Sequence, residues 1–309
     1  MKSENSLWFA ALCLFWGGNW LAVKLAVTEL PPIAAGATRA LLSGAIMLLL
    51  AGPGPVRAML ARAPWRVGAV SLLTTTICFS ALYWGAARLS TGVSAIVNNA
   101  LMPIGLLVFG YAFREDTLSR RRIAGIALGA LGLALLFARR TQGSFDADAV
   151  YGLAAVAGGT LAHCLGSVWC RPLLRMGTPM AVGSLQMILG GLLLVPLSAV
   201  LEQPGSAELA RLLSPAMLAC MAWMVLAGGV AAVAIYLRLI RDWGPARAGM
   251  YAFVSPIIAT GLGAAFLGER LGRLEIVGAL VLLAAAALVL PRRLDEGSTA
   301  PDRTPEPRP

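Results

Sequence analysis

Long apolar runs alternate with short polar connections along almost the whole chain. Ten of these runs approach the length of about 20 residues that an α-helix needs to cross a bilayer, and each is bounded by Pro, Gly or Arg. The pattern predicts transmembrane helices at approximately 7–27, 33–51, 67–87, 92–112, 121–138, 149–170, 180–201, 215–237, 247–267 and 273–291. The expected fold class is therefore an all-α polytopic membrane protein with ten transmembrane helices.

The second half of the chain repeats characteristic residues of the first half at a constant offset of 153 positions. The matched pairs are Tyr83 and Tyr236, Pro103 and Pro256, Asp116 and Glu269, Leu118 and Leu271, Arg120 and Arg273, and Gly125 and Gly278. So long a repeat in an apolar chain is typical of transporters built from two homologous halves. We expect a first five-helix repeat at 1–140, a second at 141–294, and a disordered tail at 295–309, which is rich in Pro and charge.

The distribution of Lys and Arg favours an orientation with both termini in the cytoplasm. In that orientation fifteen of them fall in inside connections and six in outside connections, as the positive-inside rule requires. Five helices per half is an odd number, so the second repeat must be inverted relative to the first. Arginines accumulate at 114–122 in the first half but at 238–247 in the second, which are different connections of the repeat.

Composition agrees with a membrane location. Only 13% of the residues are charged, about half the usual fraction, which leaves too little polar surface to solvate a globule of this size. The net charge of +10 does not indicate nucleic-acid binding, because the arginines are scattered among the connections. We expect buried reduced thiols and no metal site, since every cysteine lies inside an apolar span, namely Cys13, Cys78, Cys164, Cys170 and Cys220.

Several short motifs carry a family resemblance. The first span contains Trp-Gly-Gly-Asn at 16–19 followed by Lys24, prolines occupy the middle of the fourth and ninth spans, and Leu-Gly-Glu-Arg-Leu closes the ninth at 267–271. Over about residues 7–291 the chain resembles the EamA-type branch of the drug/metabolite transporter superfamily. The resemblance implies an inverted-repeat carrier with a central cavity, commonly exporting amino acids or related small metabolites. The first half departs from the usual Gly-Glu turn, with Arg-Glu-Asp at 114–116.

Pro103 and Pro256 are candidate hinges. A proline inside a helix lacks an amide donor and pushes away the preceding turn, which frees the carbonyls of Asn99 and Ala252. A freed carbonyl is costly in lipid, so each break should face protein or a wet cavity, where it can bind a polar ligand or act as a hinge. The alternative is a structural kink whose carbonyl is satisfied by a neighbouring helix.

Neutral polar and aromatic residues inside the spans are candidates for the substrate pathway. Asn99 stands one turn before Pro103, and because Asn98 is adjacent to it, at most one of the two should face a cavity squarely. Helix–helix hydrogen bonding is the alternative for both, and a threonine often bonds only to its own helix. The remaining candidates of this kind are Asn19, Trp20, Thr75, Thr76, Trp169, Tyr251 and Ser255. Trp65, at a predicted inside boundary, is instead an expected interfacial anchor.

Three basic side chains lie about one helical turn or more inside the ends of the spans. His163 is the only histidine, and it is either a proton-coupling group or a packed hydrogen-bonding side chain. Lys24 is about one turn from the outer end of its helix and is expected to extend to the interface. Arg39 lies about 10 Å deep, where an unpaired guanidinium costs about 2.5–3.5 kcal/mol. It needs a partner, either helix-end carbonyls or a substrate carboxylate.

All fifteen carboxylates fall in connections, in tails or at the edges of spans. The buried acid that usually relays protons or sodium in coupled carriers is missing, which favours facilitation, exchange, or proton coupling through His163. An intramembrane enzyme is disfavoured, because the chain has no His-Glu-x-x-His, Gly-x-Ser-x-Gly or nucleotide-binding loop. A channel would need a continuous polar lining.

The sequence therefore predicts a secondary transporter of a bacterial-type inner membrane, working by alternating access without ATP, cofactor or metal. Its expected partners are the lipid bilayer and a small-molecule substrate. Amino acids, including aromatic or hydrophobic ones, are the predicted substrate class, because the candidate polar set is neutral while Lys24 and Arg39 are available for a carboxylate. Export of drugs or lipophilic cations is the alternative, and the missing buried acid is evidence against it.

Overall fold

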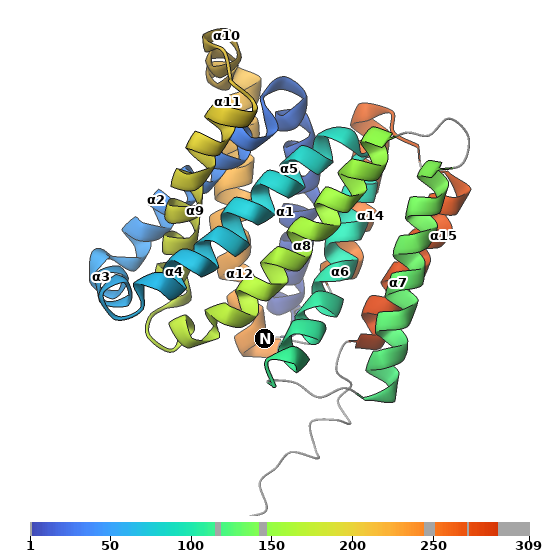
Figure 1. Ribbon diagram of the computed structural model, residues 1–309, viewed down its shortest axis with the longest axis horizontal. Coiled ribbons are helices and arrows are strands. Elements are labelled where there is room, and N and C mark those ends of the chain that lie inside the picture. The colour runs from blue at the N-terminus through green and yellow to red at the C-terminus, as the bar shows by residue number, and fades with distance from the viewer. Residues whose placement is uncertain (1, 115–118, 142–146, 244–250, 271, 290–309) are drawn as a thin grey trace, which may run out of the picture.

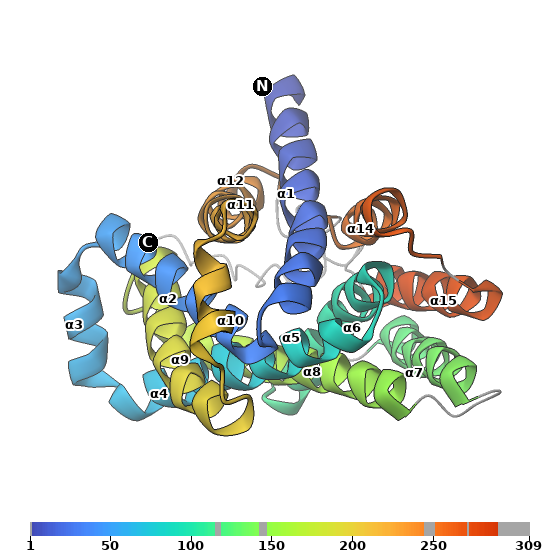
Figure 2. The ribbon, with the colours of Figure 1, turned by 90° about the horizontal axis from the view of Figure 1, so that it is seen from above.

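The computed structural model describes residues 2–114, 119–141, 147–243, 251–270 and 272–289, and these ranges are helical along most of their length, without a strand. The predicted tail at 295–309 and the repeat-matched residues Asp116, Leu118 and Leu271 lie outside the described residues. Figures 1 and 2 show the helices side by side in one bundle, with α1 (Lys2–Glu29) near its middle.

Seven helical segments among the described residues are long and apolar enough to cross a membrane, and three shorter apolar helices occupy the other predicted positions. Five of the long segments are single helices: α1, α2 (Pro32–Ala51), α6 (Thr91–Ala112), α8 (Ala147–Leu174) and α9 (Pro179–Leu201). The shorter apolar stretches belong to α7 (Arg120–Thr141), α14 (Tyr251–Leu267) and α15 (Arg273–Val289). The predicted all-α polytopic fold class is confirmed.

The third and eighth predicted spans are each interrupted by a π-helical segment. The third consists of α4 (Pro64–Ser71), the π-helix η1 (Leu72–Ile77) and α5 (Cys78–Arg88). The eighth consists of α11 (Pro215–Ala222), the π-helix η3 (Trp223–Ala231) and α12 (Ala232–Trp243). Shifting η1 by the repeat offset of 153 gives 225–230, which falls inside η3.

Short helices in the connections were not predicted. α3 (Pro53–Arg62) follows α2, and α10 (Ser206–Ala210) with the 3₁₀ turn η2 (Arg211–Leu213) precedes α11. Proline begins α2, α3, α4, α9 and α11, where its missing amide leaves no helical hydrogen bond unmade. Gly52, with φ of 76°, allows the sharp turn between α2 and α3 that a side chain would strain.

The two π-helices pack reciprocally between the halves. η1, from the first half, contacts α8 and α9, whereas η3, from the second half, contacts α1 and α2. Glycines permit both approaches, since a Cβ on Gly190 would collide with Thr75 and one on Gly228 would collide with Asn19. Each half thus places its third span against the first two spans of the other half.

The last helices of the two halves, α7 and α15, lie side by side at one edge of the bundle (Figures 1 and 2). Gly132 of α7 packs on Leu282 of α15, and Gly129 packs on Ile104 of α6. The small residues of α7 therefore serve contacts within this chain.

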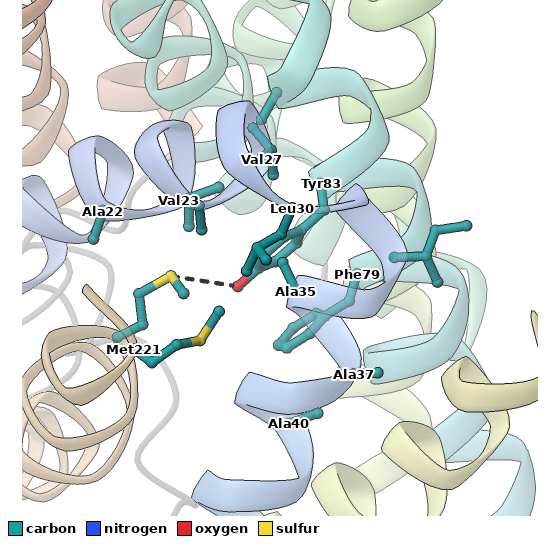
Figure 3. Close-up of a cluster of buried hydrophobic side chains, with 14 of the residues drawn as sticks. Ala22, Val23, Val27, Leu30, Ala35, Ala37, Ala40, Phe79, Tyr83 and Met221 are labelled. Carbon is teal, nitrogen blue, oxygen red and sulfur yellow. Dashed lines mark hydrogen bonds between the residues drawn. The ribbon is translucent and has the colours of Figure 1, made fainter. Parts of the chain in front are cut away.

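The largest apolar cluster among the described residues joins α1, α2, α5, α9, α11 and η3 (Figure 3). The five cysteines are all buried as free thiols, as predicted.

Candidate functional site

Arg39 lies on α2 against two aromatic rings of α5. Its Nη1 donates to the hydroxyl of Tyr83 over 3.1 Å, and its guanidinium carbon lies 5.4 Å from the centre of the Phe79 ring. Phe79 and Tyr83 are stacked, with ring centres 5.7 Å apart. The Tyr83 hydroxyl donates in turn to the Met224 sulfur of η3 over 3.9 Å, the dashed contact in Figure 3. The described partner of Arg39 is thus a neutral phenol and not a helix-end carbonyl.

Helix-end carbonyls instead bind Lys24. Its Nζ donates to the carbonyls of Ala86, Ala87 and Leu89 over 3.0, 3.2 and 2.7 Å, at the C-terminal end of α5. This position suits a cation, because the last carbonyls of a helix carry partial negative charge. Lys24 is half-buried and reaches the end of the third span, where it contacts α5. Depth alone did not reveal that the end of α5 lies beside it.

Glu269 binds the start of α6, just after the turn whose α5 end is bound by Lys24. Its carboxylate accepts from the Thr91 amide, with both oxygens at 2.9 Å, and from the Thr91 hydroxyl at 2.9 Å. Gly268, with φ of 64°, turns the chain so that the Glu269 amide bonds to the Gly263 carbonyl. A Cβ on Gly263 would collide with this carboxylate. The turn between α5 and α6 is therefore held by Lys24 of α1 and Glu269 of the second half.

The hydroxyl-rich π-helix η1 faces α8 and α9. Thr76 Oγ1 donates to the Gly190 carbonyl over 3.1 Å, which is a helix-packing contact. His163 of α8 places Nδ1 3.3 Å from the Thr74 carbonyl, so the histidine joins α8 to η1. Trp169, farther along α8, packs edge-on against Phe113 at the end of α6. The sequence pointed to Thr75, Thr76 and His163 separately. In the structure Thr75 and Thr76 lie on η1, and His163 lies on the adjacent helix α8.

Sequence reasoning missed the π-helices themselves, although one signal was present. Ser71, Thr74 and Ser80 each donate to the carbonyl four residues earlier, over 2.7–2.8 Å. Such back-bonding loosens and bends helices. A run of hydroxyl residues at 71–80 therefore marks η1, whereas η3 carries only the pair Gly228 and Gly229. π-Helical turns inside α-helices occur frequently at functional sites.

Around η3 the first half supplies polar and aromatic contacts. Trp16 Nε1 donates to the Gly228 carbonyl over 3.0 Å, and its ring centre lies 4.2 Å from that of Tyr251 and 5.3 Å from that of Tyr236. Trp20 packs with Ala95 of α6 and Ala259 of α14. The candidates Trp20 and Tyr251 thus both lie where α1 packs against the second half: Trp20 contacts Ala259, and Tyr251 contacts Trp16.

Asn99 donates from Nδ2 to the Ala95 carbonyl of its own helix over 2.8 Å, while Asn98 Oδ1 lies 3.5 Å from the hydroxyl of Thr160. Three other candidates keep a buried oxygen without a hydrogen-bond partner in the described part of the chain: Asn19 Oδ1, Thr75 Oγ1 and Ser255 Oγ. An unsatisfied buried polar atom is costly. These three oxygens lie on α1, on η1 and on α14 beside Pro256, and the described residues hold two more buried hydroxyl oxygens without a partner, those of Ser43 and Ser94.

The model of the EamA-like transporter family matches residues 5–138 and again 150–290. The chain belongs to this family. Similar proteins include the inner membrane transporter YedA of Escherichia coli, 27% identical over 90% of this chain and 88% of its own length. The PecM protein of Dickeya dadantii is 25% identical, covering 91% of this chain and 90% of its own, and the transporter YvbV of Bacillus subtilis is 23% identical, covering 93% and 92%.

Among solved structures, one crystal structure superposes on this EamA-like chain with a TM-score of 0.62, covering 92% of this chain and 95% of that one. The sequences are only 18% identical, so the likeness concerns the fold.

Proposed function

We propose that this member of the EamA-like family is a secondary transporter that exports amino acids with apolar or aromatic side chains across the inner membrane. It works by alternating access, without ATP, and both termini lie in the cytoplasm. Two inverted halves, 1–140 and 141–294, move against each other, with Pro103 and Pro256 as hinges. The two family matches and the reciprocal packing of η1 and η3 support the two-half arrangement, and the names of the relatives support transport.

The observation that carries the substrate class is that Arg39 has no acidic partner among the described residues. Each acidic side chain that the structure describes has another partner: Glu4 binds Arg238, Glu29 binds Arg211, Asp148 binds Arg88, Glu202 binds the Ile33 and Ala34 amides, Glu208 binds the Gly205 amide, and Glu269 binds Thr91. A guanidinium inside a membrane protein needs an anion or an equivalent set of acceptors. The carboxylate of an amino acid supplies one, and the Phe79 and Tyr83 rings offer an apolar wall beside it.

The test compares amino acids with the amines that lack only the carboxylate. Proteoliposomes are loaded with labelled phenylalanine or phenethylamine, and with leucine or isoamylamine, and efflux is measured for the wild type, Arg39→Gln and Arg120→Gln. Arg120 is an exposed arginine at the start of α7 and serves as the control. We expect saturable efflux of the amino acids only, reduced about 10–100-fold in kcat/KM by Arg39→Gln, as the loss of a charged hydrogen bond of about 1.5–3 kcal/mol implies.

Equal reduction of both substrate types by Arg39→Gln would refute the carboxylate assignment while leaving amino-acid transport intact. Efflux of the amines but not of the amino acids would instead support the alternative, export of lipophilic cations. The positive charge of Arg39 stands against that alternative, because it repels a cationic substrate.

A further inference from the structure

The short helix α3 carries an apolar face and a basic face. Val56 and Met59 are buried against the ends of α8 and α9, in a cluster with Leu173 and Val182. Met59 also contacts Gly177 in the turn between those helices. In Figure 1 α3 is seen nearly end-on while α4 and α8 run across the view, and Figure 2 places it at the outer edge of the bundle. α3 therefore lies crosswise at the end of the bundle, as an interfacial helix does.

Among the residues that the structure describes, the exposed side of this region is basic and contains no acid. Arg57 and Arg62 project from α3, Arg66 follows in α4, and Arg171 and Arg175 lie at the adjoining end of α8. The sequence has no Asp or Glu between Glu29 and Glu115, nor between Asp148 and Glu202. Within the described ranges, Arg57, Arg62, Arg66 and Arg175 form no ion pair. We call these five arginines the α3 basic collar.

Exposed apolar and aromatic groups adjoin the arginines of the collar in the sequence. Trp65 is 66% exposed, and the Arg66 guanidinium lies 5.3 Å from its ring centre. Leu60 and Leu174 are also exposed beside the arginines. Exposed indole and leucine side chains next to arginines are what a membrane interface favours, and they offer apolar surface for acyl chains beside the cationic groups.

We propose that the α3 basic collar binds the headgroup of an anionic phospholipid, such as phosphatidylglycerol. The guanidinium groups of Arg57, Arg62 and Arg66 receive the phosphodiester, since guanidinium pairs well with phosphate oxygens, and Trp65 with Leu60 contacts the acyl chains. Complementarity of charge selects this occupant, because a cluster of arginines at an interface repels cations and gains less from a zwitterionic headgroup, whose ammonium offsets the charge of its phosphate. In the orientation proposed above, the lipid belongs to the cytoplasmic leaflet, where anionic lipid attracts basic segments.

The test uses the full chain in detergent, titrated with dioleoylphosphatidylglycerol or dioleoylphosphatidylcholine, with retained lipid counted by native mass spectrometry. R57Q/R62Q/R66Q is compared with R120Q/R270Q/R273Q, which removes three exposed arginines from other turns and therefore the same net charge. At about 1 kcal/mol per arginine, or about fivefold each, the first variant should lose at least tenfold in phosphatidylglycerol affinity, whereas the control should keep the wild-type value.

Four results would overturn the proposal. They are equal loss of affinity in the two triple variants, equal retention of phosphatidylcholine by the wild type, full displacement of the lipid by millimolar inorganic phosphate, and wild-type affinity in the R57Q/R62Q/R66Q variant. Unfolding temperatures measured in lipid-free detergent show whether each variant is folded. A second variant, Trp65→Ala, keeps all the charges and should lower phosphatidylglycerol affinity less than the triple variant does.

Discussion

Tyr83 links the charge of Arg39 to the second half of the protein. It is fully buried, accepts from the guanidinium of Arg39 and donates to the sulfur of Met224. Among the described residues, the Tyr83 hydroxyl is the group to which Arg39 donates a hydrogen bond. The stability of the protein should therefore depend on this hydroxyl in addition to the burial of the ring.

Tyr83→Phe removes the hydroxyl and keeps the ring. We expect the free energy of unfolding in mixed micelles to fall by about 1–3 kcal/mol, because a charged donor is left without its acceptor in a buried site. Tyr151→Phe, on the exposed face of α8, should change it by less than about 0.5 kcal/mol. Equal effects of the two substitutions would contradict the assigned role of Tyr83.

The packing of η3 on α1 depends on the absence of a side chain at Gly228. A Cβ there would collide with the Asn19 side chain, whereas a Cβ on Gly158 of α8 would meet open space. Gly228→Ala should cost about 1–3 kcal/mol through overpacking, and Gly158→Ala should be neutral or stabilising by up to about 1 kcal/mol through helix propensity. Unfolding equilibria of the two variants measure the difference, and a neutral Gly228→Ala would show that α1 and η3 do not pack this closely.

At the scale of elements, the turn between α5 and α6 depends on charges from elsewhere in the chain. Glu269→Ala removes three acceptor contacts from Thr91, which leaves the Thr91 amide without an acceptor and the start of α6 with only the Ser90 side-chain cap. We expect hydrogen exchange at the Thr91 amide to accelerate by about tenfold or more, as a local opening, before global stability is lost. Glu208→Ala, which frees only the Gly205 amide at a surface helix, is the control and should leave Thr91 unchanged. Unchanged exchange in Glu269→Ala would mean that the carboxylate does not hold this turn.

Element positions were predictable because a bilayer fixes helix length, and each predicted span is occupied by a helix over its described part. α3 was missed because ten residues cannot span a membrane and their burial depends on α8 and α9. The partners of Lys24 and Arg39 were not predictable from depth, since they depend on helix rotation and on which neighbour lies opposite. For the same reason the sequence could place Asn99 in a span but could not choose between a cavity and the Ala95 carbonyl of its own helix.

At the scale of the whole molecule, reciprocal packing makes each half incomplete alone. The first half has η1 without α8 and α9 to receive it, and the second half has η3 without α1 and α2. The polar groups of η1, such as Thr76, would then lose acceptors like the Gly190 carbonyl. A membrane offers no water in its interior to replace them.

We therefore expect residues 1–144 and 145–309, expressed separately, to be degraded or to aggregate. Co-expression should restore a complex that co-purifies and unfolds near the temperature of the intact chain. Recovery of either half alone as a stable, monodisperse species would show that the halves fold independently and that contacts between them are secondary to contacts within them.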